Sequence, residues 1–271
     1  MKIKHFEEYY YVYDENNNLR EIYENNILIN RYQYNENNQI IREDNLHLKV
    51  SITYTYNASN KLIERNYYNF SLTELINIIY KDTFTYDSMD KLTTYNDEKI
   101  IYDNNYNLIK YRDANIKLSK DNQIIELDNY LFEYRNSLLL KKLNFKNQIT
   151  NYYYKNNKLI KQKGSQTIQF IYQNNEILGL KLKNQKFYFK KDFNNNVIAI
   201  LNSKNKIICK YVYDYFGNHN ILICNKDYDN IAYLNPIRYH SYYFDVELGL
   251  YYINNNYYDP EINLLINKTI F

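Results

Sequence analysis

A short aromatic motif recurs through most of the chain and constrains its fold more than any other feature. The unit is an aromatic residue, any residue, a Tyr, a polar residue that starts a turn, and a Leu or Ile about five residues on. The second aromatic residues of successive copies lie 16 to 32 residues apart. Two strands and two turns need about this length, so each period predicts one β-hairpin of a meander. Clear copies start at Tyr11, Tyr32, Tyr54 and Phe84, weaker ones at Ile100, Phe132, Tyr152 and Phe170, and a degenerate one at Ile116; copies at Phe187 and Tyr211 complete the series.

Each position of the motif has a physical role. Aromatic residues two positions apart on a strand point to the same face, so stacked hairpins bring their rings together as cross-strand pairs. Asp14, Asp87, Asp103 and Asp214 end their strands, and we interpret them as turn formers, because an acid and base pair would need two distinct environments. Repeated Asn pairs and triplets follow, and Asn is well suited to the left-handed backbone of tight turns.

The composition fits such a sheet. Tyr accounts for 36 residues and Phe for 12, with no Trp, which indicates half-buried faces whose phenol edges reach water. Disordered chains lack such aromatic content. The net charge is only +3, with 34 basic and 31 acidic residues interspersed, which disfavours a nucleic-acid partner. No apolar run is long enough to span a bilayer, and the first residues have no apolar signal-peptide core.

The last part of the chain predicts one more hairpin. Tyr239–Phe244 and Leu250–Ile253 are predicted strands around the break Asp245–Gly249. Tyr257-Tyr258-Asp259-Pro260 follows, and the pairing should stop at Pro260. On these residues, and on matching stretches from Gly179 onward, the chain resembles the Rhs/YD-repeat family. The likeness is to the core segment that closes an Rhs shell and precedes its variable C-terminal toxin.

The motif and the resemblance together predict an all-β fold. We expect a single curled antiparallel sheet of repeated YD-type hairpins, forming a partial Rhs-like shell. Residues 1–178 would be divergent hairpin repeats, and residues 179–271 a core-like segment continuous with the same sheet. Family shells are much longer, so the terminal strands should be open edges unless another polypeptide or the C-terminal segment covers them.

The chain departs from the family pattern where some members cut themselves to release the toxin. Asn263 stands for a glycine, Leu264 and Leu265 stand for Arg-Phe, and no second Asp-Pro follows Asp259-Pro260. Asn256 also replaces the usual Arg. The resemblance therefore implies a non-enzymatic structural scaffold, like the C-terminal part of a toxin-encapsulating shell, without the toxin or the self-cleavage motif.

Partners and location follow from the resemblance. An upstream shell segment or a toxin cargo would be the partner, and the protein would be secreted or at the cell surface, although it carries no signal peptide. The cytoplasm is the alternative location. A second hypothesis is a surface module that binds carbohydrate or another cell through its Tyr rows, against which we weigh plain strand-to-strand packing of the rings.

No catalytic, cofactor-binding or metal-binding residue emerges from the sequence. The four His residues (His5, His47, His219 and His240) are scattered, without metal-ligand spacing. We expect no cofactor and no metal site.

Cys209 and Cys224 are the only cysteines, and they flank a predicted hairpin. They would face each other if its midpoint lies between Phe216 and Gly217, whereas a three-residue turn at 215–217 would send the thiols to opposite faces. We favour the three-residue turn, and hence two reduced, structural thiols.

An insertion between Tyr56 and Tyr86 interrupts the period. Ser71 and Glu74 have the spacing of a capping box before an Ile-rich run, which predicts a two-turn helix. One more buried strand explains the same residues equally well.

Overall fold

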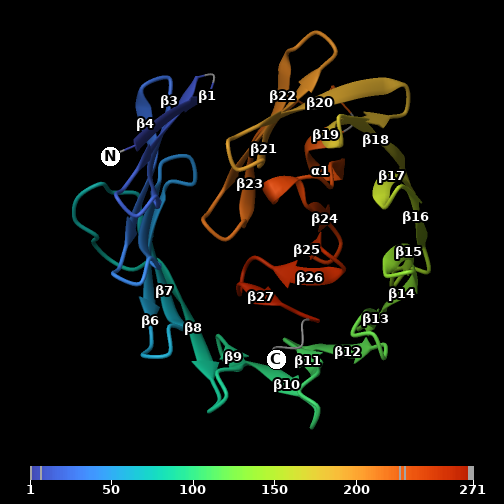
Figure 1. Cartoon of the computed structure of the whole chain (residues 1–271), viewed down its shortest axis with the longest axis horizontal. Coiled ribbons are helices and arrows are strands. Elements are labelled where there is room, and N and C mark those ends of the chain that lie inside the picture. The colour runs from blue at the N-terminus through green and yellow to red at the C-terminus, as the bar shows by residue number, and fades with distance from the viewer. Residues whose placement is uncertain (1, 7, 226, 229, 268–271) are drawn as a thin grey trace. The chain divides into compact units, whose positions relative to one another are not determined.

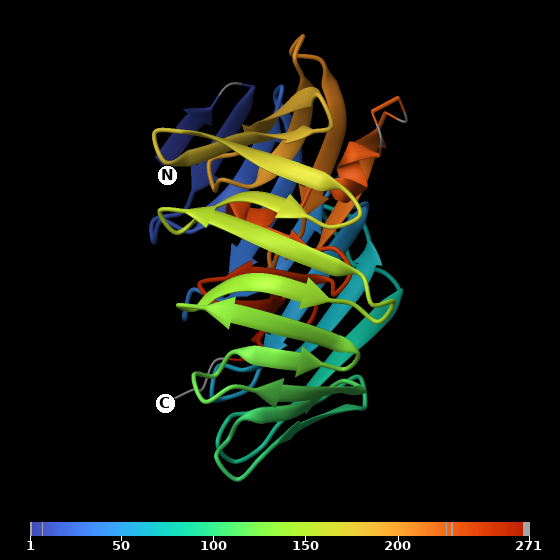
Figure 2. The same ribbon diagram turned by 90° about the vertical axis from the view of Figure 1, so that its right-hand side faces the viewer.

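The computed structural model describes residues 2–6, 8–225, 227–228 and 230–267. These residues are nearly all β, as the sequence predicted, and successive strands pair antiparallel as a meander (Figure 1). The hairpins that follow one another from β11 (Leu108–Tyr111) to β20 (Gln185–Lys191) are stacked edge to edge (Figure 2, green to yellow).

The chain divides into two compact units. The first contains residues 1–99 and 212–220, and the second contains residues 100–211 and 221–271. The division at residues 178 and 179, drawn from the family resemblance, is a different one and stays a prediction. The strands of the first unit are β1 (Lys2–Phe6), β2 (Tyr9–Tyr13), β3 (Leu19–Glu24), β4 (Ile27–Tyr34), β5 (Ile40–Asn45), β6 (Val50–Tyr56), β7 (Leu62–Asn69), β8 (Tyr80–Tyr86) and β9 (Leu92–Tyr95).

The second unit holds the rest of the meander, a short helix and a second sheet. Three strands have residues in both units: β10 (Glu98–Tyr102), β22 (Ile207–Tyr213) and β23 (His219–Cys224). The others are β11 (Leu108–Tyr111), β12 (Ala114–Leu118), β13 (Ile124–Leu127), β14 (Tyr130–Arg135), β15 (Leu138–Leu143), β16 (Ile149–Lys155), β17 (Lys158–Lys163), β18 (Thr167–Gln173), β19 (Glu176–Leu182), β20 (Gln185–Lys191) and β21 (Val197–Asn202).

One class of turn repeats throughout the meander, and it confirms the turn-forming role of the aspartates. In each loop an Asp, Asn or Ser oxygen accepts hydrogen bonds from backbone N–H groups further along the loop. Asp87 Oδ1, for example, accepts from Met89 N and Lys91 N, both at 2.9 Å. The fourth residue of the loop has a positive φ, which Asn tolerates well. Loops of this class start at Asp14, Asn35, Asn57, Asp87, Asp103, Ser119, Asn144, Asp192, Asn202 and Asp214.

The second class is the two-residue turn with both residues at positive φ. This is the backbone of a type I′ hairpin turn, whose twist matches the flanking strands. Asn dominates it because the left-handed region costs Asn less than other non-glycine residues. The pairs are Asn25-Asn26, Asn96-Asp97, Asn136-Ser137, Asn156-Asn157, Asn174-Asn175 and Asn254-Asn255.

The second aromatic of the motif also ties neighbouring repeats together. Tyr34 OH donates to Leu19 O, Tyr56 OH to Ile40 O, and Tyr86 OH to Leu62 O, each at 2.8 Å. Each bond joins a Tyr to the carbonyl of the aliphatic residue that follows the preceding loop. These Tyr hydroxyls are thus engaged in hydrogen bonds within the sheet.

Two local expectations were wrong. Residues 70–79 form neither a helix nor a strand, because Arg42 binds the Ser71 and Thr73 carbonyls and holds the segment as an irregular loop. Tyr239–Phe244 is not one strand, since η1 (Tyr239–Ser241) is a 3₁₀ turn with His240 at φ 48°, and only Tyr243 begins the strand.

The C-terminal strands form a sheet of their own rather than continuing the meander. They follow the short helix α1 (Ile231–Leu234) and pair antiparallel in chain order. The pairing of β26 ends before Pro260, as the sequence predicted. The four strands are β24 (Tyr243–Asp245), β25 (Leu250–Ile253), β26 (Asn256–Asp259) and β27 (Leu264–Leu265).

Candidate functional site

The small C-terminal sheet packs on one face of the meander within the second unit (Figure 1, red against green and yellow). The Tyr257 ring lies 5.7 Å from the Phe132 ring, and the Tyr243 ring lies 5.8 Å from the Tyr152 ring, centroid to centroid. These are ordinary separations for packed aromatic side chains. The C-terminal segment therefore supplies the second layer of this unit's core.

A buried ion cluster fixes the small sheet to the meander. Lys142 Nζ lies 2.6 Å from both carboxylate oxygens of Asp245 and 2.6 Å from Glu247 Oε2. The side chains of Lys142 and Asp245 are 4% and 1% exposed. Burial raises the pKa of Asp245, and the Lys142 charge opposes that rise. Because charges this deeply buried are costly when unpaired, the cluster depends on all its members.

A second contact holds the Asp-Pro segment. Tyr111 OH donates to Asp259 Oδ2, while Asp259 Oδ1 accepts from Glu261 N at 2.7 Å. Arg112 Nη1 lies 2.8 Å from Glu261 Oε2. Asn263, which stands for the family glycine, has a φ of 53°, the left-handed conformation that a glycine would adopt freely. The carboxylate of Asp259 thus serves as a hydrogen-bond acceptor that fixes the turn.

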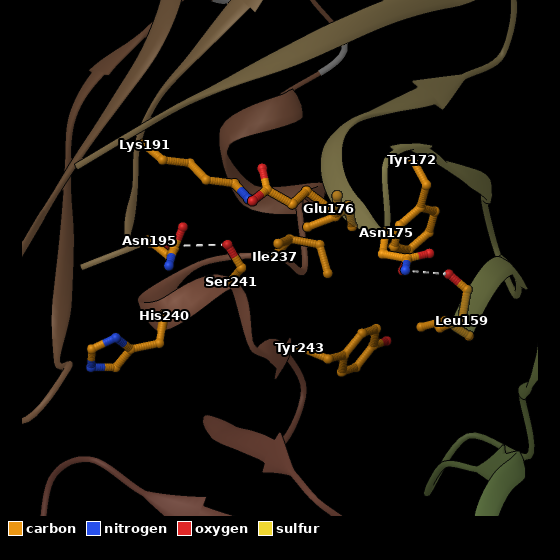
Figure 3. A pocket seen from close by; sticks show the side chains of 11 residues that line it. Leu159, Tyr172, Asn175, Glu176, Lys191, Asn195, Ile237, His240, Ser241 and Tyr243 are labelled. Carbon is orange, nitrogen blue, oxygen red and sulfur yellow. Dashed lines mark hydrogen bonds between the residues drawn. The ribbon is translucent and has the colours of Figure 1, made fainter. Parts of the chain in front are cut away.

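A pocket of about 390 Å³ opens beside this layer (Figure 3). His240 and Lys191 lie on the opposite side of it from Tyr172 and Leu159. Its lining residues are Leu159, Tyr172, Asn175, Glu176, Ile177, Lys191, Asn195, Ile237, His240, Ser241 and Tyr243.

Hydrogen bonds to the turn at residues 194–196 fix the rim of the pocket. His240 Nδ1 lies 2.7 Å from Asn194 O, and Ser241 Oγ donates to Asn195 O at 2.9 Å. Burial lowers the pKa of Lys191, and the Glu176 carboxylate acts in the opposite direction. The pocket therefore offers a cation, a carboxylate, an imidazole and aromatic surface, a mixture suited to binding a small polar ligand.

The first unit contains a buried carboxylate pair under the 212–220 segment. Glu43 Oε2 accepts hydrogen bonds from Tyr215 N at 2.9 Å and Tyr54 OH at 3.1 Å, and Glu43 Oε1 accepts from Asn45 Nδ2 at 3.1 Å. Burial, followed by the charge of Asp214, raises the pKa of Glu43 to about 8. Burial also raises the pKa of Asp214.

Rings close over this pair. Tyr215 lies 5.9 Å from Tyr32, and Phe216 lies 5.5 Å from Tyr54, between centroids. The pair is interior, so its role in this structure is to hold the turn.

The other two described histidine side chains, His47 and His219, each contact a neighbouring side chain. His47 Nε2 lies 3.1 Å from Glu24 Oε2, and the His219 ring lies 6.1 Å from the Tyr213 ring. The side chain of His5 lies outside the described part of the structure. Within the described residues, no group of three or more His, Cys, Asp or Glu side chains is placed to hold a metal ion. The described part of the chain also has no helix of the length and apolarity that a bilayer crossing requires.

Sequence reasoning missed both the pocket and the buried pair. The pair had a readable signal, since Arg42, Glu43, Asp44 and Asn45 are four consecutive polar residues in a strand, and three of them are fully buried. The pocket had none, because its rim joins residues from 159 to 243.

Comparison with known proteins places this fold. A crystal structure of TcdB2-TccC3-Cdc42 superposes on 96% of the chain with a TM-score of 0.58 and 16% sequence identity, and the match covers 17% of that chain. The chain therefore shares the fold of the matched part of that structure. No family model matches the sequence.

Two curated relatives are nucleases by name. They are tRNA3(Ser)-specific nuclease WapA of Bacillus spizizenii and tRNA nuclease WapA of Bacillus subtilis, each 25% identical over 198 residues. The aligned region is 68% of this chain and 8% of each relative, so the chain spans a small part of their length.

These names correct one expectation. The prediction that the protein is not an enzyme is contradicted by relatives that are nucleases. It rested on the resemblance to a shell segment without the toxin or the self-cleavage motif after Asp259-Pro260. Hairpin repeats carry structural residues at every period, so their sequence does not report on the activity of the protein that contains them.

Proposed function

We propose that this chain forms part of the wall of an Rhs-type shell in a toxin protein of the tRNA-nuclease kind. The observation that carries the proposal is the structural likeness to TcdB2-TccC3-Cdc42 over 96% of the chain. The match to WapA nucleases supports the class of toxin.

The sheet has the properties that a wall needs. Each hairpin pairs with the next through continuous antiparallel ladders, and the Asp-type loops and Tyr hydrogen bonds repeat at each step. In the second unit, one face is already covered by the small C-terminal sheet, which is fixed by the Lys142–Asp245 ion pair. β1 pairs with β2 along one edge, and a preceding shell segment would add its last strand along the other.

Cryo-electron microscopy of the full-length protein that contains this sequence tests the proposal. We expect residues 1–271 to form part of a continuous wall around an enclosed volume that holds other polypeptide. A sheet with solvent on both faces and no enclosed volume would refute it.

A tRNA-cleavage assay tests the enzymatic part separately. Activity of the full-length protein on a tRNA pool is measured before and after brief protease treatment. An enclosed nuclease should become more active when the wall is opened. Equal activity in both samples would contradict enclosure, and no activity in either would contradict the nuclease class.

The same proposal places the protein outside the cytoplasm, secreted or at the cell surface. Fractionation of the producing cells checks this, with recovery solely in the cytoplasm as the opposing result.

A second candidate function is carbohydrate binding, and the observation that favours it is the pocket in Figure 3. Tyr172 and Tyr243 supply ring surface there, and Asn175, Ser241 and His240 supply polar groups. A glycan array with the wild type and with His240→Ala is the test. We expect binding that weakens in the variant, and an array without any bound glycan would dismiss this candidate.

A further inference from the structure

The hairpin of β22 and β23 determines how the two cysteines are placed. At its turn, Asp214 N donates to Asn218 O at 2.9 Å. Residues 215–217 between them form the three-residue turn that the sequence favoured. At its open end, Asn225 N donates to Ile208 O at 2.9 Å, so these two residues face each other. One step inward along both strands, Cys209 faces Cys224.

A β-bulge explains why the expected orientation of the thiols, to opposite faces, was wrong although the expected three-residue turn is present. A three-residue turn alone would offset the two cysteines by one residue and send them to opposite faces. The opposition of Ile208 and Asn225 requires one extra residue on the β23 side of the hairpin. The equivalent hairpin of β4 and β5, whose loop starts at Asn35, has the same change of register. There it falls between Gln33 and Tyr34 of β4.

The resulting geometry suits a disulfide. Ile208 and Asn225 form a hydrogen-bonded position, so the adjacent Cys209 and Cys224 occupy a non-hydrogen-bonded one, where Cα atoms are about 4.5 Å apart and side chains share a face. Disulfides span Cα separations of about 4.4 to 6.8 Å. Both thiols are free in this structure. The Cys224 sulfur is also close enough to Cys209 to add to the rise in the Cys209 pKa, to about 12, that burial causes.

We propose that Cys209 and Cys224 are a redox-active pair that forms a reversible cross-strand disulfide with each other. The oxidant is a low-molecular-weight disulfide such as glutathione disulfide. Cys224 is partly exposed, whereas Cys209 is buried, so Cys224 reacts first. Its thiolate attacks one sulfur of glutathione disulfide and releases one glutathione thiolate. The Cys209 thiolate then attacks Sγ of Cys224 and releases the second. Two electrons and the two thiol protons pass to the two glutathione molecules.

The bridge would lock the base of the β22–β23 hairpin. Its base, with Cys209 and Cys224, belongs to the second unit, and its turn at residues 214–218 belongs to the first. Closing the loop from 209 to 224 restricts the unfolded hairpin more than the folded one. The oxidised hairpin should therefore be more stable than the reduced one.

The test equilibrates the folded chain in buffers of increasing glutathione disulfide, then blocks free thiols and measures intact mass. We expect both cysteines to escape blocking together, with a mass lower by two hydrogens, and dithiothreitol to restore both. The Cys209→Ala variant is the control, and its Cys224 should stop as a mixed disulfide with glutathione. Wild-type protein that stops at this same adduct, or that keeps both thiols, would overturn the proposal.

A thermal melt gives an independent readout. The oxidised wild type should melt about 5 °C above the reduced form or higher, since the bridge closes a loop of ordinary length. Cys209→Ala should show no such increase under the same oxidant. A Tm that falls on oxidation would also overturn the proposal, because the folded hairpin would then not accommodate the bond.

Discussion

Glu43 should make the protein less stable as the pH rises through neutrality, and Glu43→Gln should remove this effect. The folded pKa of Glu43 is raised to about 8 from an ordinary value of 4.5. Between these values the folded state keeps a proton that the unfolded state has lost, so the free energy of unfolding falls with rising pH. One pH unit corresponds to about 1.4 kcal/mol, which gives up to about 5 kcal/mol over the whole interval. Below the ordinary pKa, both states are protonated and no penalty applies.

Urea unfolding followed by circular dichroism at pH 5, 6, 7 and 8 measures the effect. At pH 5 the variant should be about 1 kcal/mol less stable than the wild type, because the introduced amide cannot replace every hydrogen bond to Asn45, Tyr54 and Tyr215. Towards pH 8 the difference should reverse, and the variant should become the more stable protein.

Glu64→Gln, in β7 of the same sheet, is the matched control. Hydrogen bonds from Lys81 and Asn66 hold the pKa of Glu64 below its ordinary range, so its ionisation does not change between pH 5 and 8. Its effect on stability should be constant over that interval. If the difference between Glu43→Gln and wild type were equally constant, the assignment of a protonated, buried Glu43 would be refuted.

Three further predictions concern single side chains. Lys142→Met leaves the buried Asp245 carboxylate unpaired and should cost about 3 to 5 kcal/mol of unfolding free energy. Lys141→Met, which breaks an exposed pair with Glu133, should cost less than about 1 kcal/mol. Equal losses of the two variants in chemical denaturation would contradict the argument. Tyr56→Phe removes the hydrogen bond to Ile40 O and should lower the free energy of unfolding by about 1 kcal/mol. Tyr153→Phe, at an exposed ring, should leave it nearly unchanged. No loss of stability in Tyr56→Phe would argue against the bond between repeats. Lys49→Gly should raise the Tm, because Lys49 is exposed and has a φ of 59°, a conformation that glycine adopts without strain. The variant should be more stable by about 0.5 to 1 kcal/mol. A lower Tm would show that the Lys49 side chain contributes more to stability than the strain costs.

The hairpin architecture was accessible from sequence because its causes are local. Asp87 acts on backbone groups two and four residues away, and paired residues such as Asn25 and Asn26 act on their own φ angles. A motif built from such short-range effects keeps its meaning wherever it occurs in the chain. Where a local rule had a competitor, it failed, as at residues 70–79, whose backbone carbonyls are bound by Arg42 from another strand.

The sequence by itself determined an all-β meander, the positions of its turns and the end of pairing before Pro260. Only the tertiary structure decided that Glu43 is buried beneath Tyr215, that Lys142 meets Asp245, and that Cys209 faces Cys224 through a bulge. The first set depends on backbone preferences of neighbouring residues. The contacts of Glu43 with Tyr215 and of Lys142 with Asp245 join residues more than a hundred positions apart, and the cysteine pair depends on one extra residue in a ladder. Their energies come from burial and pairing, which exist only after the sheets have packed.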